Sequence, residues 1–221
     1  MAEMQTWLVA GPLFDIWTDA EEKVAAVHLP HFLCLGGEET DISLMKIAHF
    51  VEARLTLEKP ARVTRFHAVL EKPKFSLLGV LIKPLYDKFF SVHAVVILYQ
   101  ILKNITTLNL YLVPNDSSLI QAIQDAEEKF HSVLVRKPPQ TIMPLHYGSR
   151  YTVSSSVDLK IIPKELHFTY KNPRHQQSYV QFSIRSTEIV DISLKNKEDL
   201  CSVWDTSLEP GASCWMVDFY G

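Results

Sequence analysis

Histidine and cysteine side chains that could bind a metal ion lie close together near the start of the chain. His28, His31 and Cys34 share one short segment, and imidazole and thiolate are ligands that zinc prefers. Pro30 and the apolar residues around it are more typical of a bent strand than of a metal site. We therefore expect no metal ion here and no cofactor elsewhere in the chain.

The familiar enzyme signatures are missing. Gly36 and Gly37 lie in the segment that comes nearest to a phosphate-binding loop, but the Lys and Ser/Thr that such a loop requires do not follow them. The sequence also lacks the G-x-S-x-G, H-E-x-x-H and C-x-x-C patterns. Taken alone, His49 is a strand histidine and Phe75-Ser76 a dipeptide at the edge of a strand.

Composition narrows the class of protein. The chain has 221 residues, 47% of them hydrophobic, and a formal net charge of −3 with its Lys and Arg residues scattered. With this charge pattern we expect neither a basic surface that binds nucleic acid nor a polybasic patch that binds a membrane. No signal peptide or membrane span is evident, and three widely spaced cysteines do not suggest a disulfide framework. We expect a cytoplasmic protein.

Short strands dominate the predicted secondary structure. They recur every 8 to 15 residues with turn residues between them, which is typical of a β-sandwich or of two sandwiches. The expected strands cover residues 62–70, 92–102, 108–113, 132–136, 150–154, 160–162, 165–170, 179–185, 189–194 and 201–206.

One segment has the spacing of a helix. Residues 115–118 offer several N-cap candidates. The apolar residues Leu119, Ile123, Ala126 and Phe130 then follow at helical spacing. The pattern predicts a helix from about Ser117 to Lys129, with Glu127 and its acidic neighbours on the polar side. A helix of this kind can simply cover one end of a sheet.

Several long segments of the sequence carry a resemblance to a known family. They are LEKPARV, AVLEKPKFSLLGVLI, LYLVPND, YGSRYTVSSS and LKIIPKELHFTYKNP. In order and spacing they resemble the function-to-find domain, or FIIND, of NLR-family and CARD-bearing inflammasome sensors. The resemblance runs from about Gln5 to about Pro210.

The resemblance implies an all-β fold of two packed β-sandwich-like domains, ZU-like then UPA-like, with one short amphipathic helix in the second. Residues 1–75 would form the C-terminal part of the ZU-like domain, residues 76–210 the UPA-like domain, and residues 211–221 a tail. The proline-containing stretch 71–74 marks the expected boundary.

The resemblance also implies self-cleavage between Phe75 and Ser76, with His49 as the base. The separation of 27 residues between His49 and Ser76 matches the family pattern. The Ser76 hydroxyl would attack the carbonyl carbon of Phe75 in an N-to-O acyl shift, and water would hydrolyse the resulting ester. This is a single-turnover reaction of the chain on itself, not the activity of a turnover enzyme.

One position departs from the family pattern. That pattern, H-F-x-x-E, has an acid where this chain has Ala53. Glu52 beside it is a candidate auxiliary acid, although neighbouring residues of a strand point to opposite faces. We therefore expect partial cleavage.

Two functions of different classes stay open. The first is a FIIND-type autoproteolytic module of inflammasome signalling whose halves stay associated after the cut. The second is a non-catalytic interaction or decoy module. For both, the resemblance implies binding to other FIIND or UPA domains and to a dipeptidyl peptidase of the post-proline class. A cytoskeletal linker fits less well, because scaffolds of that kind lack the KFSLLG junction.

Overall fold

The protein divides into two compact units, each built almost entirely of β-strands. In the computed structural model the first unit comprises residues 1–93 with 115–118, and the second comprises residues 94–114 with 119–221. The strands confirm the predicted all-β class. The structure describes residues 7–35, 42–51, 54–83, 90–101, 106–185 and 188–209.

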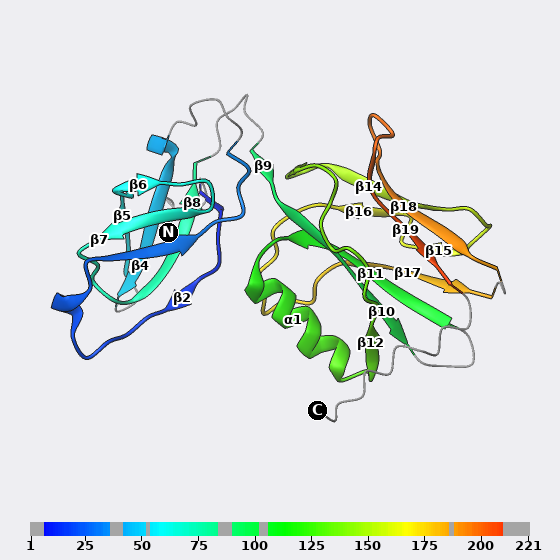
Figure 1. The fold of residues 1–221 in the computed structure, drawn as a ribbon, viewed down its shortest axis with the longest axis horizontal. Coiled ribbons are helices and arrows are strands. Elements are labelled where there is room, and N and C mark those ends of the chain that lie inside the picture. The colour runs from blue at the N-terminus through cyan, green and yellow to red at the C-terminus, as the bar shows by residue number, and fades with distance from the viewer. Residues whose placement is uncertain are drawn as a thin grey trace. The chain divides into compact units, whose positions relative to one another are not determined.

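The first unit contains a five-stranded and a three-stranded antiparallel sheet (Figure 1). The larger sheet has the order β1-β8-β4-β5, and β2 also pairs with β8; the smaller has the order β3-β7-β6. The strands are β1 (Leu8–Val9), β2 (Phe14–Asp15), β3 (Ala26–Pro30), β4 (Met45–Val51), β5 (Arg54–Glu58), β6 (Arg62–Val63), β7 (His67–Glu71), β8 (Leu77–Ile82) and β9 (Ser91–Val92), with short 3-10 helices η2 (Glu21–Lys23) and η3 (Ile42–Leu44).

β8 holds the larger sheet together. Its sequence LLGVLI is apolar throughout, and every residue from Leu78 to Ile82 is buried. A strand buried on both faces reads as a continuous apolar run and belongs in the interior of a sheet. β8 accordingly pairs with β4 on one side and with β1 and β2 on the other.

The predicted strand over residues 62–70 is wrong in one respect, because a turn divides it into β6 and β7. The Thr64 side chain accepts a hydrogen bond from the His67 amide at 3.1 Å, and the Thr64 amide donates to the His67 carbonyl at 2.8 Å. Arg65 and Phe66 stand between them, exposed. A threonine side chain that bonds to nearby backbone can make a turn without Gly or Pro, so the usual turn signals are absent here.

The second unit consists of two larger antiparallel sheets and one α-helix, with the sheet orders β12-β10-β11-β17-β15 and β16-β14-β18-β19. Its elements are β10 (Ala94–Ile101), β11 (Thr106–Pro114), α1 (Ser117–Glu128), β12 (Ser132–Leu134), β13 (Leu145–His146), β14 (Arg150–Ser155), β15 (Ile161–Ile162), β16 (Glu165–His167), β17 (Tyr179–Ile184), β18 (Val190–Asn196) and β19 (Ser202–Leu208).

α1 covers one face of the first of these sheets (Figure 1). Asp116 caps the helix through its Oδ1, which accepts a hydrogen bond from the Ser118 amide at 2.8 Å. Leu119 and Ile123 then pack on alternate residues of β10 and β11. The predicted helix is thus confirmed. Within the described ranges, no helix is long and apolar enough to cross a membrane.

The predicted polar and apolar sides of α1 need one correction. The sequence pattern predicts Glu127 on the polar side and Phe130 on the apolar side, but Glu127 is 2% exposed and Phe130 is 69% exposed. Residues 119, 123 and 127 repeat every four positions and face the sheet together. Phe130 follows the end of the helix and leaves that stripe. The buried carboxylate is tolerated because Asn109 and Tyr111 on β11 donate hydrogen bonds to it.

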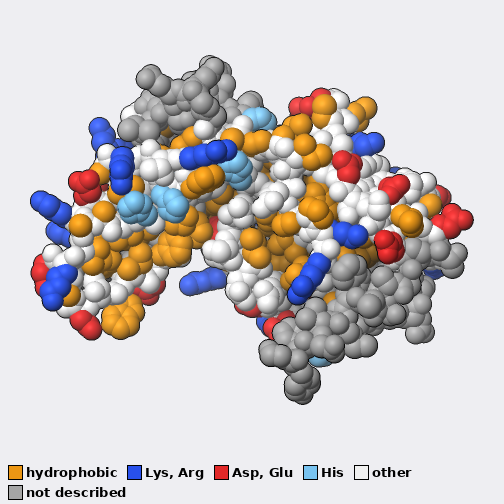
Figure 2. Space-filling view, viewed as in Figure 1, with side chains coloured by type: hydrophobic (Ala, Val, Ile, Leu, Met, Phe, Trp, Pro, Cys, Tyr) orange, Lys and Arg blue, Asp and Glu red, His pale blue; other side chains and the backbone are white. Residues whose placement is uncertain are grey.

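A buried histidine in the first unit links stability to pH. His31 is 6% exposed, and its Nε2 lies 3.1 Å from the Thr64 carbonyl oxygen, to which it can donate. Nδ1 is buried with no hydrogen-bond partner among the described residues. Burial lowers the pKa of His31, and the nearby His67 and His93 lower it further. Several histidines lie close together on the face shown in Figure 2.

We expect acidification from about pH 7.5 to 5.5 to destabilise the first unit. Above its ordinary pKa of 6.5, His31 is neutral in both the folded and the unfolded chain. As the pH falls through that value, the unfolded chain binds a proton that the folded chain does not, so stability is lost. The loss from His31 should be on the order of 1 kcal/mol, measured by urea unfolding at the two pH values.

The matched variants are His31→Gln and His167→Gln. His167 also lies beside a carbonyl oxygen, that of Gly148 at 3.0 Å, but it is exposed. His31→Gln should reduce the pH dependence, whereas His167→Gln should leave it unchanged. An equal pH dependence in all three proteins would contradict the assignment to His31.

Candidate functional site

Three neighbouring strands of the larger sheet in the first unit place His49 at the centre of the candidate site. In β4, His49 is paired with Leu78 of β8 on one side and with Thr56 of β5 on the other. Residues paired across antiparallel strands point to the same face. His49 is 6% exposed, so the sheet holds its imidazole in a largely buried position.

Ser76 lies on the β8 side of His49. Ser76 immediately precedes β8 and stands two residues before Leu78, so the alternation of the strand, continued by one residue, predicts that it lies on the His49 face. Such diagonal neighbours are about 7–8 Å apart between Cα atoms, within reach of a long or aromatic side chain. Ser76 is partly exposed, and its Oγ donates to the Leu77 carbonyl oxygen at 3.3 Å. No hydrogen bond joins the side chains of Ser76 and His49, both of which are described.

Glu58 lies on the β5 side of His49. Its Oε2 is 3.1 Å from His49 Nε2, within ion-pair distance, and the two side chains are 55% and 7% exposed respectively. Nε2 has no hydrogen-bond partner among the described residues, so the two groups lie within ion-pair distance but are not hydrogen-bonded.

Glu58 is the carboxylate that the sequence reasoning missed. Glu52, the expected auxiliary acid, and Ala53 lie outside the described residues. The signal for Glu58 was present in the spacing. Val51 and Arg54, which have two residues between them along the chain, pair across β4 and β5. Counting back from this pair places residue 56 opposite His49 and residue 58 diagonal to it. A hairpin register would therefore have found Glu58.

β2 lies on the other side of the Phe75-Ser76 segment. Asp15 is paired with Leu77, and the Ile16 amide donates to the Ser76 carbonyl oxygen at 3.4 Å. Phe75 is partly buried. Before it, Lys72 has a φ of 45° and its amide donates to the Ala25 carbonyl oxygen at 2.9 Å. This left-handed residue turns the chain from β7 in the smaller sheet towards β8 in the larger.

The arrangement places an imidazole beside a carboxylate, with a hydroxyl on the residue that precedes the neighbouring strand. Ser76 precedes β8, His49 lies on the neighbouring strand β4, and Glu58 lies on β5, which pairs with the other side of β4. An imidazole can remove a proton from a hydroxyl near neutral pH, and a carboxylate beside it stabilises the imidazolium that forms. The same order of groups serves nucleophilic catalysis on unrelated folds.

Comparison with known proteins identifies the family. The sequence profile described as "Function to find" (FIIND) matches residues 1–88, and that of the UPA-FIIND domain matches residues 92–208. Caspase recruitment domain-containing protein 8 of Homo sapiens is 40% identical over 210 residues, which cover 93% of this chain and 39% of that protein. NACHT, LRR and PYD domains-containing protein 1a of Mus musculus is 40% identical over 211 residues, 94% of this chain and 18% of that protein.

The matched region is a limited part of these relatives. The chain spans about two fifths of the human protein and less than a fifth of the mouse protein. The matches to the two domain profiles follow one another along the chain with a gap of only a few residues between them. The chain belongs to the FIIND family and carries a FIIND segment followed by a UPA-FIIND domain.

Proposed function

We propose that this chain is a regulatory module of inflammasome-type signalling that cuts its own backbone once, between Phe75 and Ser76. The observation that supports the proposal is the position of His49 on β4, next to Glu58 of β5 on one side and to β8, which Ser76 precedes, on the other. The reaction is single-turnover, because the chain is its own substrate.

The proposed reaction moves one acyl group and then adds water. His49 takes the proton of Ser76 Oγ while that oxygen attacks the carbonyl carbon of Phe75. The peptide C–N bond breaks, the protonated imidazole returns its proton to the Ser76 nitrogen, and an ester joins Phe75 to Ser76 Oγ. Water then hydrolyses the ester, which leaves a carboxylate on Phe75 and restores the Ser76 hydroxyl. Each step balances without a metal or cofactor.

Glu58 and β2 assist in different ways. The Glu58 carboxylate lies beside Nε2 of His49 and helps to orient the ring. Because Nε2 faces Glu58, Nδ1 is the nitrogen left for the proton of Ser76. The Ser76 side chain must first rotate away from the Leu77 carbonyl. Meanwhile, the hydrogen bond from the Ile16 amide steadies the backbone of Ser76.

The proposed cut lies inside the first unit and not between the two units. Cleavage gives fragments 1–75 and 76–221, corresponding to the expected ZU-like part and the UPA-like domain with its tail. β8 then belongs to the second fragment, while β1, β2, β4 and β5 belong to the first. The backbone hydrogen bonds of β8 therefore hold the two fragments together.

The partners follow from the family and not from a particular contact. We propose that the chain binds other FIIND or UPA domains and a dipeptidyl peptidase of the post-proline class, and that it acts in the cytoplasm. Its relatives include a protein named for caspase recruitment. An uncut interaction or decoy module is the second candidate, favoured by the Ser76 hydroxyl, which bonds to Leu77 and not to His49.

The mass of newly made protein tests the proposal. We expect part of the chain, translated in a purified cell-free system without proteases, to appear as two polypeptides, the second starting at Ser76, beside uncut protein. Intact-mass spectrometry under denaturing conditions resolves these from the uncut 25.3 kDa chain. A single uncut species after a day at neutral pH would refute self-cleavage and favour the interaction module.

A further inference from the structure

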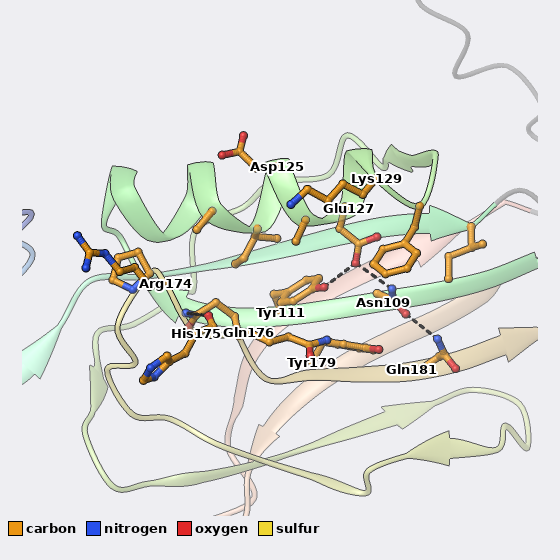
Figure 3. A pocket seen from close by; sticks show the side chains of 17 residues that line it. Asn109, Tyr111, Asp125, Glu127, Lys129, Arg174, His175, Gln176, Tyr179 and Gln181 are labelled. Carbon is orange, nitrogen blue, oxygen red and sulfur yellow. Dashed lines mark hydrogen bonds between the residues drawn. The ribbon is translucent and has the colours of Figure 1, made fainter.

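The second unit contains a pocket between α1, the outer face of its first sheet and the loop that leads into β17 (Figure 3). Its volume is about 680 Å³, within the usual range of about 300–1,000 Å³ for small-ligand sites. Its lining includes Ile123 and Glu127 of α1, Tyr111 of β11, Tyr179 of β17 and Arg174 of the loop. The pocket lies within one unit and takes no part in the proposed cleavage.

Local hydrogen bonds fix the loop wall of the pocket. Gln177 is 7% exposed, and its Nε2 donates to the carbonyl oxygens of Asn172 and His175 at 3.1 and 3.0 Å. The Arg174 amide donates to Asn172 Oδ1 at 2.9 Å. A wall held by a buried side chain is formed before any ligand arrives, so binding need not order it.

A buried carboxylate forms the floor. Glu127 is 2% exposed, and its Oε1 accepts hydrogen bonds from Asn109 Nδ2 at 2.9 Å and from the Tyr111 hydroxyl at 2.5 Å. Figure 3 shows these bonds, with Gln181 donating in turn to Asn109. Burial first, and then this hydrogen bond, raise the pKa of Tyr111, so its hydroxyl stays a donor.

The second carboxylate oxygen is the unusual feature. Among the described residues, the buried Oε2 of Glu127 has no hydrogen-bond partner, and no Lys, Arg or His forms an ion pair with Glu127. A buried carboxylate is costly unless a cation or further donors compensate it. An unsatisfied atom of this kind at a pocket floor therefore points to a partner supplied from outside the chain.

We propose that this pocket binds a primary alkylammonium group, held by Glu127 Oε2 and by the rings of Tyr111 and Tyr179. The centroids of these two rings lie 5.2 Å apart, and aromatic faces attract a cation within about 6 Å. A single free oxygen suits an ammonium better than a guanidinium, which prefers two parallel bonds to one carboxylate. The alkyl chain would lie against Ile123 and Ala126.

Entry of the ammonium requires one side chain to move. Because Oε2 is closed to solvent, a lining group must shift before a ligand reaches it. Phe130 lines the pocket and is 69% exposed, so its ring can move with little loss of packing. Lys129 and Arg174 are exposed at the rim, where solvent and salt weaken their repulsion of an incoming cation.

The ammonium could come from a free alkylamine or from a lysine side chain, and two probes distinguish these sources. We would titrate the full chain with n-hexylamine and with the peptide acetyl-Gly-Lys-Gly-amide, using calorimetry at low salt. We expect hexylamine to bind at least about 30-fold more tightly than the uncharged n-hexanol, a difference of about 2 kcal/mol. Binding of the lysine peptide as well would indicate a protein partner, whereas binding of hexylamine alone would indicate a free amine.

Matched variants locate the binding at Glu127. Glu127→Gln keeps an oxygen that can accept from Asn109 and Tyr111 but removes the charge, and should weaken hexylamine about 30-fold or more. Asp125→Asn removes the same charge from an exposed residue lining the pocket and should change the affinity less than about 3-fold. Tyr179→Leu keeps the charge and should weaken binding about 5-fold, which provides a test if Glu127→Gln fails to fold.

Three results would overturn the proposal. They are the absence of hexylamine binding, equal binding of hexylamine and hexanol, and unchanged affinity in both Glu127→Gln and Tyr179→Leu. Because the pocket does not involve Ser76, the titration can be repeated in the Ser76→Ala chain. Failure of self-cleavage and failure of ammonium binding would therefore be seen separately.

Discussion

Ser76→Ala should leave the chain entirely uncut. It removes Ser76 Oγ, the atom that attacks the Phe75 carbonyl carbon in the proposed reaction. The substitution removes one partly exposed hydroxyl and should leave the fold unchanged. Cell-free translation followed by intact-mass spectrometry would then show a single species. Fragments that persist in this variant would mean that another protease makes the cut.

His49→Ala should slow the same cut by about 10²–10⁴-fold, the usual contribution of a general base. At the upper end, a reaction complete within an hour would need about a year. Because His49 is 6% exposed, its truncation also leaves a small cavity. Circular dichroism and thermal unfolding should therefore accompany the time course, and a folded His49→Ala protein that cuts at the normal rate would contradict the mechanism.

Glu58→Gln should have a much smaller effect, at most about 5-fold. The Glu58 side chain is 55% exposed, and an ion pair in contact with water is worth only about 0–1 kcal/mol. Glu71, another exposed glutamate of the first unit, supplies the control Glu71→Gln, which should leave the rate unchanged. An effect of Glu58→Gln as large as that of His49→Ala would show that the carboxylate is closer to the reacting groups than the exposed position suggests.

The sequence predicts the elements that depend on local pattern. Leu119 and Ile123 recur at helical spacing, and the helix forms where expected. Glu127 falls on the same stripe but was placed on the polar side, because a charge on a helix is normally solvated. Its burial depends on Asn109 and Tyr111 from a neighbouring strand. No periodicity within the helix can reveal such partners.

The candidate site shows the same division between local and non-local information. His49, Phe75 and Ser76 could be identified from the family resemblance and its spacing alone. To identify Glu58 one must know the register of β4 against β5. The pairing of Asp15 with Leu77 joins β2 to β8, which are too far apart along the chain for a short motif to reveal. The expected acid at Glu52 came from local spacing along the chain, whereas the contact with Glu58 arises across strands.

The place of β8 predicts how the cut chain behaves. Because β8 pairs with strands of the first fragment on both sides, we expect fragments 1–75 and 76–221 to elute together from a sizing column. They should separate only in denaturant. Leu78 is paired with His49 and fully buried, so it contributes to this association more than any exposed residue of the strand.

Leu78→Ala should therefore destabilise the first unit by about 2–5 kcal/mol, the usual cost of truncating a buried leucine. Leu77→Ala is the matched control, since Leu77 is the adjacent leucine of the same strand but is 37% exposed. Its cost should be within about 1 kcal/mol. Hydrogen exchange of β4 and β8 amides would measure the destabilisation caused by each substitution. The Ser76→Ala background prevents the cut, and these amides report on the first unit alone.

In the chain that can cut itself, the same substitution should release the fragments. A loss of about 3 kcal/mol corresponds to more than a hundredfold weaker association, so the Leu78→Ala fragments should separate on the column at concentrations where the Leu77→Ala fragments still elute together. Equal elution of both variants would mean that contacts outside β8 hold the fragments. In that case the release of the second fragment after cleavage would not depend on the stability of the first unit.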